Sequence, residues 1–209
     1  MERTVLNKQQ KYSQDQQDQL LKIACDSLQN GVKNGKALRI DTTEFDNSLI
    51  ENRATFVTLH KEHANNKELR GCIGSLIAHQ PLVIDVAENA YSAGFRDPRF
   101  PALTNDELEV LEVHISILTP PELMSFTSRD DLLEQIRPNV DGLILSDGFS
   151  RGTFLPSVWE QLPGQEEFLQ NLLMKAGLPH DYWSNSIKME RYETICFGNG
   201  YSNLKEQNI

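Results

Sequence analysis

The fold prediction starts from Ala54-Thr-Phe-Val-Thr-Leu-His60 and Leu69-Arg-Gly-Cys-Ile73, two stretches separated by the polar segment His63-Ala-Asn-Asn-Lys67. β-Branched and aromatic residues are frequent in the first stretch, which favours a β-strand. The asparagine pair between the stretches favours a turn, after which the chain returns as a second strand. The sequence therefore predicts a β-hairpin here.

Four more strands are predicted further along the chain. Leu111 to Ile117 alternates apolar and polar residues, as a strand with one buried face does. Gly142 to Ser146 and Phe149 to Leu155 flank Asp147-Gly148, a strong signal for a two-residue hairpin turn. Ile187 to Phe197 also alternates and is predicted to form one last strand.

Helices are predicted between these strands. Ser13-x-x-Gln16 and Thr104-x-x-Glu107 have the form of capping boxes, and Ser128-x-x-Asp131 opens another helix. One more helix is predicted to follow Pro81 and to end before Asp97-Pro98. Another is predicted from about Glu166 to Gly177. Alternating strands and hairpins outnumber continuous apolar strands, so we expect an α+β fold with mostly antiparallel or mixed sheet and flanking helices.

Length and charge limit the class of protein. A chain of 209 residues makes one large domain or two small lobes at ~100–200 residues per domain. The net charge of −10 argues against general binding to nucleic acid or anionic membranes. Two basic and ten acidic residues lie between Thr104 and Ser150, which carries most of this charge. This acidic surface is either a solvated face or a docking surface for a basic partner.

The cysteine content favours a reducing compartment. Cys25, Cys72 and Cys196 are odd in number and widely spaced, without a CxxC pattern. The N-terminal residues lack an apolar signal-peptide core, and no window is apolar enough for a membrane helix. We therefore expect a cytoplasmic protein.

Cys72 is the first candidate functional residue. It lies between Gly71 and Gly74, and glycines inside a strand indicate a bulge or the close approach of another backbone or a ligand. In a regular strand Arg70 shares a face with Cys72, where its charge would lower the pKa of the thiol. The alternative is that Cys72 is a small buried apolar residue.

Arginines form the second group of candidates. Arg96, Asp97 and Arg99 follow the helix that begins near Pro81, and Arg151 lies on the later hairpin. Guanidinium groups gathered in one cleft would bind a carboxylate or phosphate bidentately. The alternative is that Asp97 and the arginines form ion pairs that hold the loop.

No metal site or cofactor is predicted. The metal-ligating residue types near Cys72 do not follow a known zinc-site spacing, the candidates being His60, His63, His79 and His114. The chain also contains no P-loop, GxGxxG or GxSxG motif.

Several blocks of sequence are distinctive. The most specific block is LRGCIG at Leu69 to Gly74, and FRDPRFPAL follows at Phe95 to Leu103. Further blocks follow in order, namely ISILTPPE (115–122), GLIL (142–145), RGTFLPSVWE (151–160), FLQNLLMKAGL (168–178) and the terminal strand at 192–197. Together these blocks resemble the AMMECR domain family, whose members include the AmmeMemoRadiSam system protein A. The resemblance covers residues 12–197.

The resemblance implies a single domain over residues 12–197, built of two packed lobes or subdomains, with polar tails at 1–11 and 198–209. The system name implies a Memo-like protein and a radical SAM protein as partners. By motif, the positions carried over as ligand-binding candidates are Arg70, Gly71, Gly74, Arg96, Asp97, Arg99 and Arg151. Cys72 joins them, and the resemblance assigns none of these residues a catalytic role.

Three functions remain open from the sequence. The first is a ligand- or partner-binding accessory protein that holds a small anion between the LRGCIG strand and the Arg96/Arg99 loop. The second is an enzyme with Cys72 as nucleophile or redox thiol and with His60 or His114 as base. The third is a regulatory protein associated with nucleic acid, which the net charge disfavours.

Overall fold

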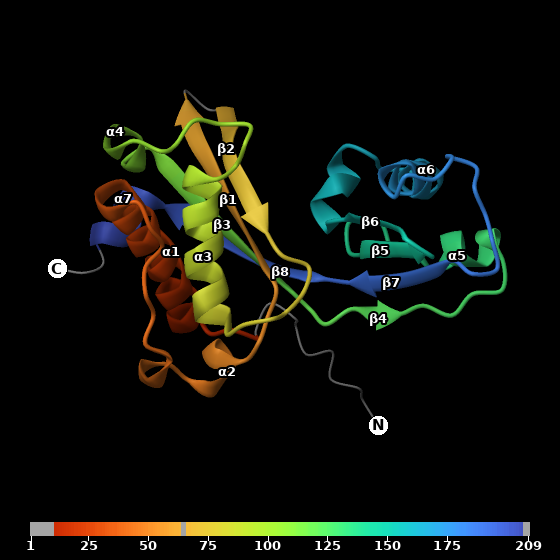
Figure 1. Cartoon of the computed structure of the whole chain (residues 1–209), viewed down its shortest axis with the longest axis horizontal. Helices are drawn as coiled ribbons and strands as arrows, with labels where there is room; N and C mark the ends of the chain where they lie inside the picture. The colour runs from red at the N-terminus through yellow and green to blue at the C-terminus, as the bar shows by residue number, and fades with distance from the viewer. Residues whose placement is uncertain (1–10, 64–65, 207–209) are drawn as a thin grey trace. The chain divides into compact units, whose positions relative to one another are not determined.

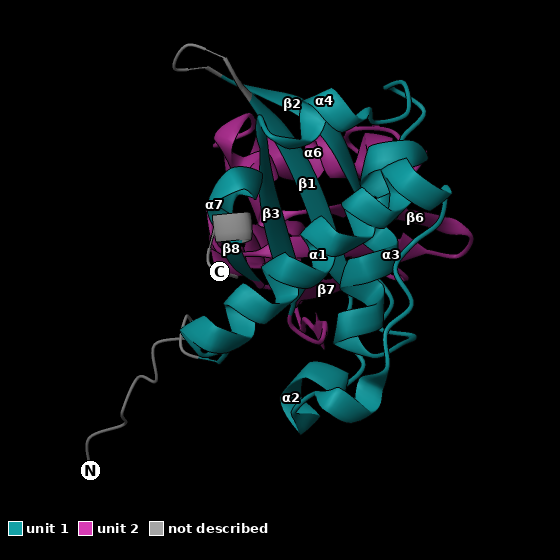
Figure 2. Ribbon diagram, turned by 90° about the vertical axis from the view of Figure 1, so that its left-hand side faces the viewer, with its two compact units in different colours: residues 1–118, 195–209 teal, residues 119–194 magenta. Residues whose placement is uncertain are grey.

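A computed structural model describes residues 11–63 and 66–206 of the chain (Figure 1). The chain divides into two compact units, coloured separately in Figure 2. Unit 1 comprises residues 1–118 and 195–209, and unit 2 comprises residues 119–194. The described part has seven α-helices and two four-stranded antiparallel sheets, so the predicted α+β fold is confirmed.

Unit 1 is built on a sheet with the strand order β2-β1-β3-β8. The bounds of these strands are β1 (Thr55–His63), β2 (Asn66–Gly74), β3 (Leu111–Leu118) and β8 (Thr194–Gly200). β1 pairs antiparallel with both β2 and β3, which confirms the hairpin around residues 54–73. Residues 64–65 of the expected turn lie outside the described residues. β2 is an edge strand.

Helices cover one face of this sheet, and Figure 2 shows α1 and α3 in front of β1 and β3. Ser13 and Gln16 form the predicted capping box, and Gly35 ends α1 with a left-handed φ of 68°. The helices of unit 1 are α1 (Gln14–Asn34), α2 (Asn47–Ile50), α3 (Leu82–Phe95), α4 (Asn105–Leu108), α7 (Tyr201–Glu206) and a short 3-10 turn at Thr42–Glu44. The cap at Thr104 and Glu107 is likewise present.

Alternation along the strands separates the two faces of this sheet. Val57 and Leu59 on β1 and Ile115 on β3 are fully buried in the core that α1 and α3 cover. Thr58 and His114, which alternate with them and pair with each other across β1 and β3, are only half-buried. We call the second face the outer face; it carries Phe56, Thr58, His60, Cys72, Glu112, His114, Ser116 and Cys196.

Unit 2 has its own sheet, with the strand order β4-β7-β5-β6, and its own core. Trp159 stacks on Phe168 at 3.7 Å between ring centroids, and both rings are buried. Its elements are β4 (Glu122–Leu123), α5 (Arg129–Gln135), β5 (Gly142–Asp147), β6 (Ser150–Phe154), a 3-10 turn (Pro156–Glu160), α6 (Gln165–Lys175) and β7 (Lys188–Tyr192).

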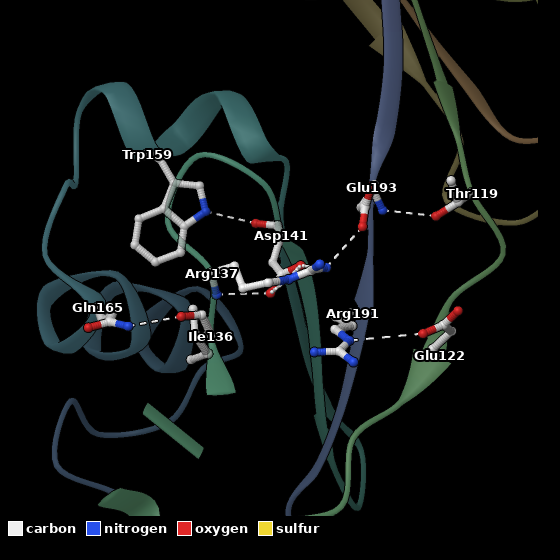
Figure 3. Close-up of polar contacts among 9 residues, drawn as sticks. All are labelled: Thr119, Glu122, Ile136, Arg137, Asp141, Trp159, Gln165, Arg191 and Glu193. Atoms are coloured by element: carbon white, nitrogen blue, oxygen red, sulfur yellow. Dashed lines mark hydrogen bonds and ion pairs between the residues drawn. The ribbon is translucent and has the colours of Figure 1, made fainter. Parts of the chain in front are cut away.

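A buried carboxylate organises the centre of unit 2 (Figure 3). Asp141 is fully buried, and Arg137 binds it through both its guanidinium and its backbone N–H. Arg137 also donates to Glu193 at 2.9 Å, while Trp159 Nε1 donates to the Asp141 carbonyl at 2.7 Å. Glu193 donates its backbone N–H to Thr119 Oγ1, so the network joins both ends of unit 2.

The prediction of one strand over Ile187 to Phe197 is wrong. The chain forms β7 and β8, which belong to different sheets and are separated by Glu193. The hydrogen bonds that Glu193 makes to Thr119 and Arg137 hold the chain at the break. An alternating pattern looks the same whether one sheet or two receive the strand, so the sequence did not reveal this division.

Two further expectations need correction. The sequence predicts a polar tail from residue 198. In the structure residues 198–200 belong to β8 and residues 201–206 form α7, whose Tyr201 and Leu204 are buried in the core of unit 1. The hairpin turn is Gly148-Phe149, because Asp147 still pairs with Ser150. The Asp147 carboxylate accepts hydrogen bonds from Tyr182, Ser184 and Ser186, which hold it at the strand end.

Candidate functional site

The motif Leu69 to Gly74 occupies the free edge of the unit 1 sheet, and it is not a regular strand. Leu59 pairs with Gly71, but the next residue, His60, pairs with Leu69. Arg70 is therefore an extra residue, a β-bulge, which bends the strand locally. The expected alignment of Arg70 with Cys72 on one face is wrong, because that alignment requires an unbroken two-residue period.

Arg70 instead forms a buried ion pair. Its side chain is 6% exposed, and it donates to both carboxylate oxygens of Glu107 at 2.8 and 3.1 Å and to the Pro101 carbonyl at 2.9 Å. This pairing holds the pKa of Glu107 well below its usual range, assisted by Lys61. Among the described residues no contact joins Arg70 to the Cys72 thiol, so Arg70 is committed to structure.

Gly71 and Gly74 are needed because other backbone lies very close to them. A Cβ on Gly71 would lie 2.2 Å from the Ala93 carbonyl oxygen of α3. A Cβ on Gly74 would lie 2.4 Å from the Thr55 carbonyl oxygen and 2.4 Å from the Phe56 ring. Both structures that these glycines indicate are present, namely a bulge at Arg70 and the close approach of protein backbone.

Asp97 and Arg99 cover the edge of β2 at Cys72. Asp97 Oδ2 accepts the Cys72 backbone N–H at 2.9 Å, and Arg99 donates to the Cys72 carbonyl at 3.4 Å. Arg99 also donates to Asp97 through Nε at 2.9 Å and through Nη2 at 2.7 Å. The pair thus occupies backbone groups that an edge strand otherwise leaves open to another chain. The Arg99 guanidinium holds the pKa of the buried Asp97 carboxyl well below its usual range, against the effect of burial.

The remaining predicted arginines differ in their surroundings. Arg96 is exposed, and its guanidinium lies 5.0 Å from the centre of the Tyr91 ring. Arg151 is exposed on β6 of unit 2, so it is not part of the cluster that unit 1 forms. The residues that contacts in unit 1 bring together are Cys72, Asp97 and Arg99, while Arg96 is linked to them only along the same loop.

The Cys72 thiol lies on the outer face. Thr58 Oγ1 donates to Cys72 Sγ at 3.3 Å, and His114 pairs with Thr58 on the far side of β1. Burial lowers the pKa of His60, and the neighbouring His114 ring, 5.2 Å away between centroids, lowers it further. Within the described part of the chain, neither histidine hydrogen-bonds to Cys72, because the Thr58 strand separates Cys72 from His114.

Sequence reasoning missed three of these neighbours. Glu107 was assigned to a helix cap only, although the same carboxylate also pairs with Arg70. Thr58 and Phe56 were assigned to a strand and given no role, yet they surround Cys72 and Gly74. Phe56 and Thr58 flank the buried Val57 on β1, so both side chains lie on the opposite face, because alternate residues of a strand share a face. That alternation was the signal that could have placed them beside Cys72.

The described residues contain neither a metal-binding cluster nor a membrane-spanning helix. No three histidine, cysteine, aspartate or glutamate side chains of residues 11–63 and 66–206 are arranged to hold a metal ion. None of the helices in that same part of the chain is both long enough and apolar enough to span a bilayer.

Comparison with known proteins identifies relatives over most of the chain. Residues 21–197 match the family model AMMECR1. Protein MJ0810 of Methanocaldococcus jannaschii is 43% identical over 153 residues, covering 70% of this chain and 73% of that protein. A protein of Methanothermobacter thermautotrophicus is 37% identical over 191 residues, covering 88% of this chain and 95% of its own length.

The fold is also similar to a solved structure. The crystal structure of the uncharacterized protein PH0010 from Pyrococcus horikoshii has a TM-score of 0.81 and 31% sequence identity. The match covers 92% of this chain and 95% of that chain. The family model covers most of the chain and confirms the resemblance to this family, and the chain belongs to the AMMECR1 family.

Proposed function

We propose that this protein is a cytoplasmic accessory protein that binds an anionic group of a ligand or partner at Arg99 and Arg96, beside Cys72. The observation that carries the proposal is the state of Arg99. Its side chain is 53% exposed, although Asp97 fixes it through Nε and Nη2. A guanidinium that is held in place and still accessible loses little conformational freedom when it binds an anion.

The local charge supports an anionic ligand. Asp97 and Arg99 neutralise each other, and Arg96 on the same loop adds a positive charge within an otherwise acidic protein. The Arg70–Glu107 pair does not compete for the ligand, because Arg70 is buried. An anion at this loop therefore meets the fixed and accessible guanidinium of Arg99, and Arg96 adds to the positive charge of the loop.

The experiment measures binding to the full chain. Native mass spectrometry of the purified protein detects a copurified anion, and calorimetry with inorganic phosphate and with succinate compares the two anion classes. We expect Arg99→Ala to weaken binding about tenfold, the size of a charge-assisted hydrogen bond. The matched control is Arg39→Ala, because Arg39 is exposed on the chain between α1 and α2. Equal binding by wild type, Arg99→Ala and Arg96→Ala would contradict the proposal.

We also propose that the protein partner is a Memo-like protein or a radical SAM protein. The family resemblance supports this choice, since such systems pair the three proteins. The test mixes the purified full chain with each purified candidate and measures complex formation by gel filtration with light scattering. Failure to form a complex with either candidate, at concentrations of tens of micromolar, would remove this part of the proposal.

A second candidate is an enzyme that uses Cys72, and the contact from Thr58 Oγ1 to Sγ favours it. The thiol is half-buried, so reagents can reach it. The test follows alkylation of Cys72 as a function of pH, with Cys72→Ser identifying the site. A nucleophilic thiol should show a midpoint well below about 8.5. A midpoint at or above that value would argue for the binding function alone.

A further inference from the structure

Unit 1 contains a cavity where β3 begins and β8 ends. Its volume is about 460 Å³, within the range of roughly 300–1,000 Å³ that is typical of small-molecule sites. The segment 109–112, the end of β8 and the start of α7 line it together with Lys67 of β2, and Figure 2 shows α7 and β8 beside β3. The described lining residues include neither Arg99 nor Cys72, so this space is not part of the proposed anion site.

Glu112 gives the cavity a carboxylate that is already held in place. Its Oε1 accepts a hydrogen bond from Lys67 Nζ at 2.8 Å, and His114 Nε2 lies 3.0 Å from the same oxygen. The His114 ring in turn packs over Gly198 of the cavity wall, where a Cβ would lie 2.5 Å from Nδ1. Among the described residues no hydrogen bond reaches Glu112 Oε2, so this oxygen can accept one from a ligand.

Polar groups from the end of β8 and from α7 are also available on the cavity wall. Asn199 Oδ1 accepts the Gly200 backbone N–H at 2.8 Å and Asn203 Nδ2 at 3.2 Å, which orients both amides. Within the described chain neither Asn199 Nδ2 nor Asn203 Oδ1 makes a hydrogen bond, and the Ser202 hydroxyl makes none either. The wall therefore offers a donor, an acceptor and a hydroxyl that can act as both.

The charges and the apolar surface of the cavity limit the class of ligand. One lysine and two glutamates line it, namely Lys67, Glu109 and Glu112, and their net charge of −1 disfavours an anion. A cation is disfavoured because the Lys67 ammonium already lies against the Glu112 carboxylate. The described lining residues include no aromatic side chain on which a planar ring could stack. A neutral compound held by hydrogen bonds is the class that fits.

We infer that this cavity binds a small neutral polyhydroxy compound, a polyol or a monosaccharide, through Asn199, Ser202 and Glu112. A hydroxyl group both donates and accepts, so a ligand with several hydroxyls can satisfy the mixed donors and acceptors of the wall. Val110 is 47% exposed and offers an apolar surface to the C–H groups of such a ligand. Because the Asn199 amide and the Glu112 carboxylate are already oriented, binding costs little conformational entropy.

The experiment titrates the full chain with matched probes and follows binding by NMR. The probe myo-inositol carries a hydroxyl on every ring carbon, whereas cyclohexanol carries a single hydroxyl on the same ring. D-Ribose is a smaller polyhydroxy probe, and putrescine and succinate represent the cation and the anion. Shifts of the Asn199 and Asn203 side-chain amide signals locate each probe, because both amides line the cavity.

Two substitutions at Ser202 test the site, because Ser202 is exposed and its hydroxyl makes no hydrogen bond within the described chain. Ser202→Ala removes one hydrogen-bonding group and should weaken the binding of myo-inositol about fivefold. Ser202→Tyr places a ring in the cavity and should abolish binding. Ser157→Tyr is the matched control, since Ser157 is exposed on the 3-10 turn of unit 2, and it should leave binding unchanged.

We expect the two polyhydroxy probes to shift the Asn199 and Asn203 signals and cyclohexanol to leave them in place. Equal shifts with cyclohexanol and myo-inositol would overturn a ligand held by hydrogen bonds. Shifts with only putrescine or only succinate would overturn a neutral ligand. No shift with either polyhydroxy probe at about 10 mM, or binding that both Ser202 variants leave unchanged, would refute the site. Arg99→Ala should not change these titrations, so the anion site stands or fails separately.

Discussion

Asp97 is the single residue on which the candidate site depends most. Its buried carboxylate accepts the Cys72 N–H and two bonds from the Arg99 side chain. We expect Asp97→Asn to lower the free energy of unfolding of unit 1 by about 2 kcal/mol at pH 7, because hydrogen bonds to a charged group are lost. Both tryptophans lie in unit 2, so far-UV circular dichroism in urea is the measurement for unit 1.

The pH dependence of this loss follows from the pKa of Asp97, which is lowered in the folded protein. The stabilisation is fully present above the unfolded value of about 4, and it is lost as the pH falls from there toward the folded value. The difference between wild type and Asp97→Asn should therefore be constant from pH 7 to 5 and smaller at pH 3. Asp181→Asn, an exposed control, should change stability by less than about 0.5 kcal/mol. A difference that grows at pH 3 would contradict this account.

At the residue scale, the sequence identified the residues of the candidate site but did not predict where all of their side chains point. It singled out Asp97 and Arg99 and included their ion pair as one alternative, which the structure contains. It misdirected Arg70, because a bulge changes which face a side chain takes and depends on pairing with a distant strand. Gly71 was correctly noticed, but only the position of α3 explains why it must be glycine.

At the scale of elements, the Arg137–Asp141 ion pair connects the segment between α5 and β5 to Glu193, which follows β7. We expect Arg137→Ala to destabilise unit 2 by about 3–5 kcal/mol, because Asp141 is fully buried and would keep an uncompensated charge. Arg137→Lys should recover only part of the loss, since an ammonium cannot reproduce the bonds from Nε and Nη2. Tryptophan fluorescence in urea reports on this unit through Trp159, whose ring nitrogen bonds to Asp141.

Arg191 provides the matched control for this prediction (Figure 3). It lies 3.9 Å from Glu122, whose carboxylate is 76% exposed, whereas Asp141 is fully buried. Arg191→Ala should therefore cost less than about 1 kcal/mol. Equal losses for Arg137→Ala and Arg191→Ala would show that burial of the Asp141 charge is not the cause.

Local signals predicted most elements and failed where distant contacts decide. The capping boxes at Ser13 and Thr104 gave helix starts correctly, because a cap is made within four residues. The division between β7 and β8 depends on Glu193 meeting Thr119, which is far away in the sequence. α7 was missed because only Tyr201 and Leu204 contribute apolar surface, and their burial depends on the rest of unit 1.

The whole molecule is a discontinuous unit 1 with unit 2 inserted between Leu118 and Ile195. Unit 2 is one continuous segment with its own core around Trp159, Phe168 and Leu172. Its sheet is closed within the segment, since β4, β5, β6 and β7 all come from residues 119–194. Such a unit meets the usual conditions for a domain that folds alone.

We therefore expect the fragment 119–194 to fold by itself. Its tryptophan emission should be that of buried indole, with a cooperative urea transition, because Trp159 is 1% exposed in the complete chain. The control fragment 119–187 lacks β7, which lies between β4 and β5, and should remain unfolded. A fragment 119–194 with the emission of the urea-unfolded chain would show that unit 2 requires unit 1, and the two cores would then have to be treated as one cooperative structure.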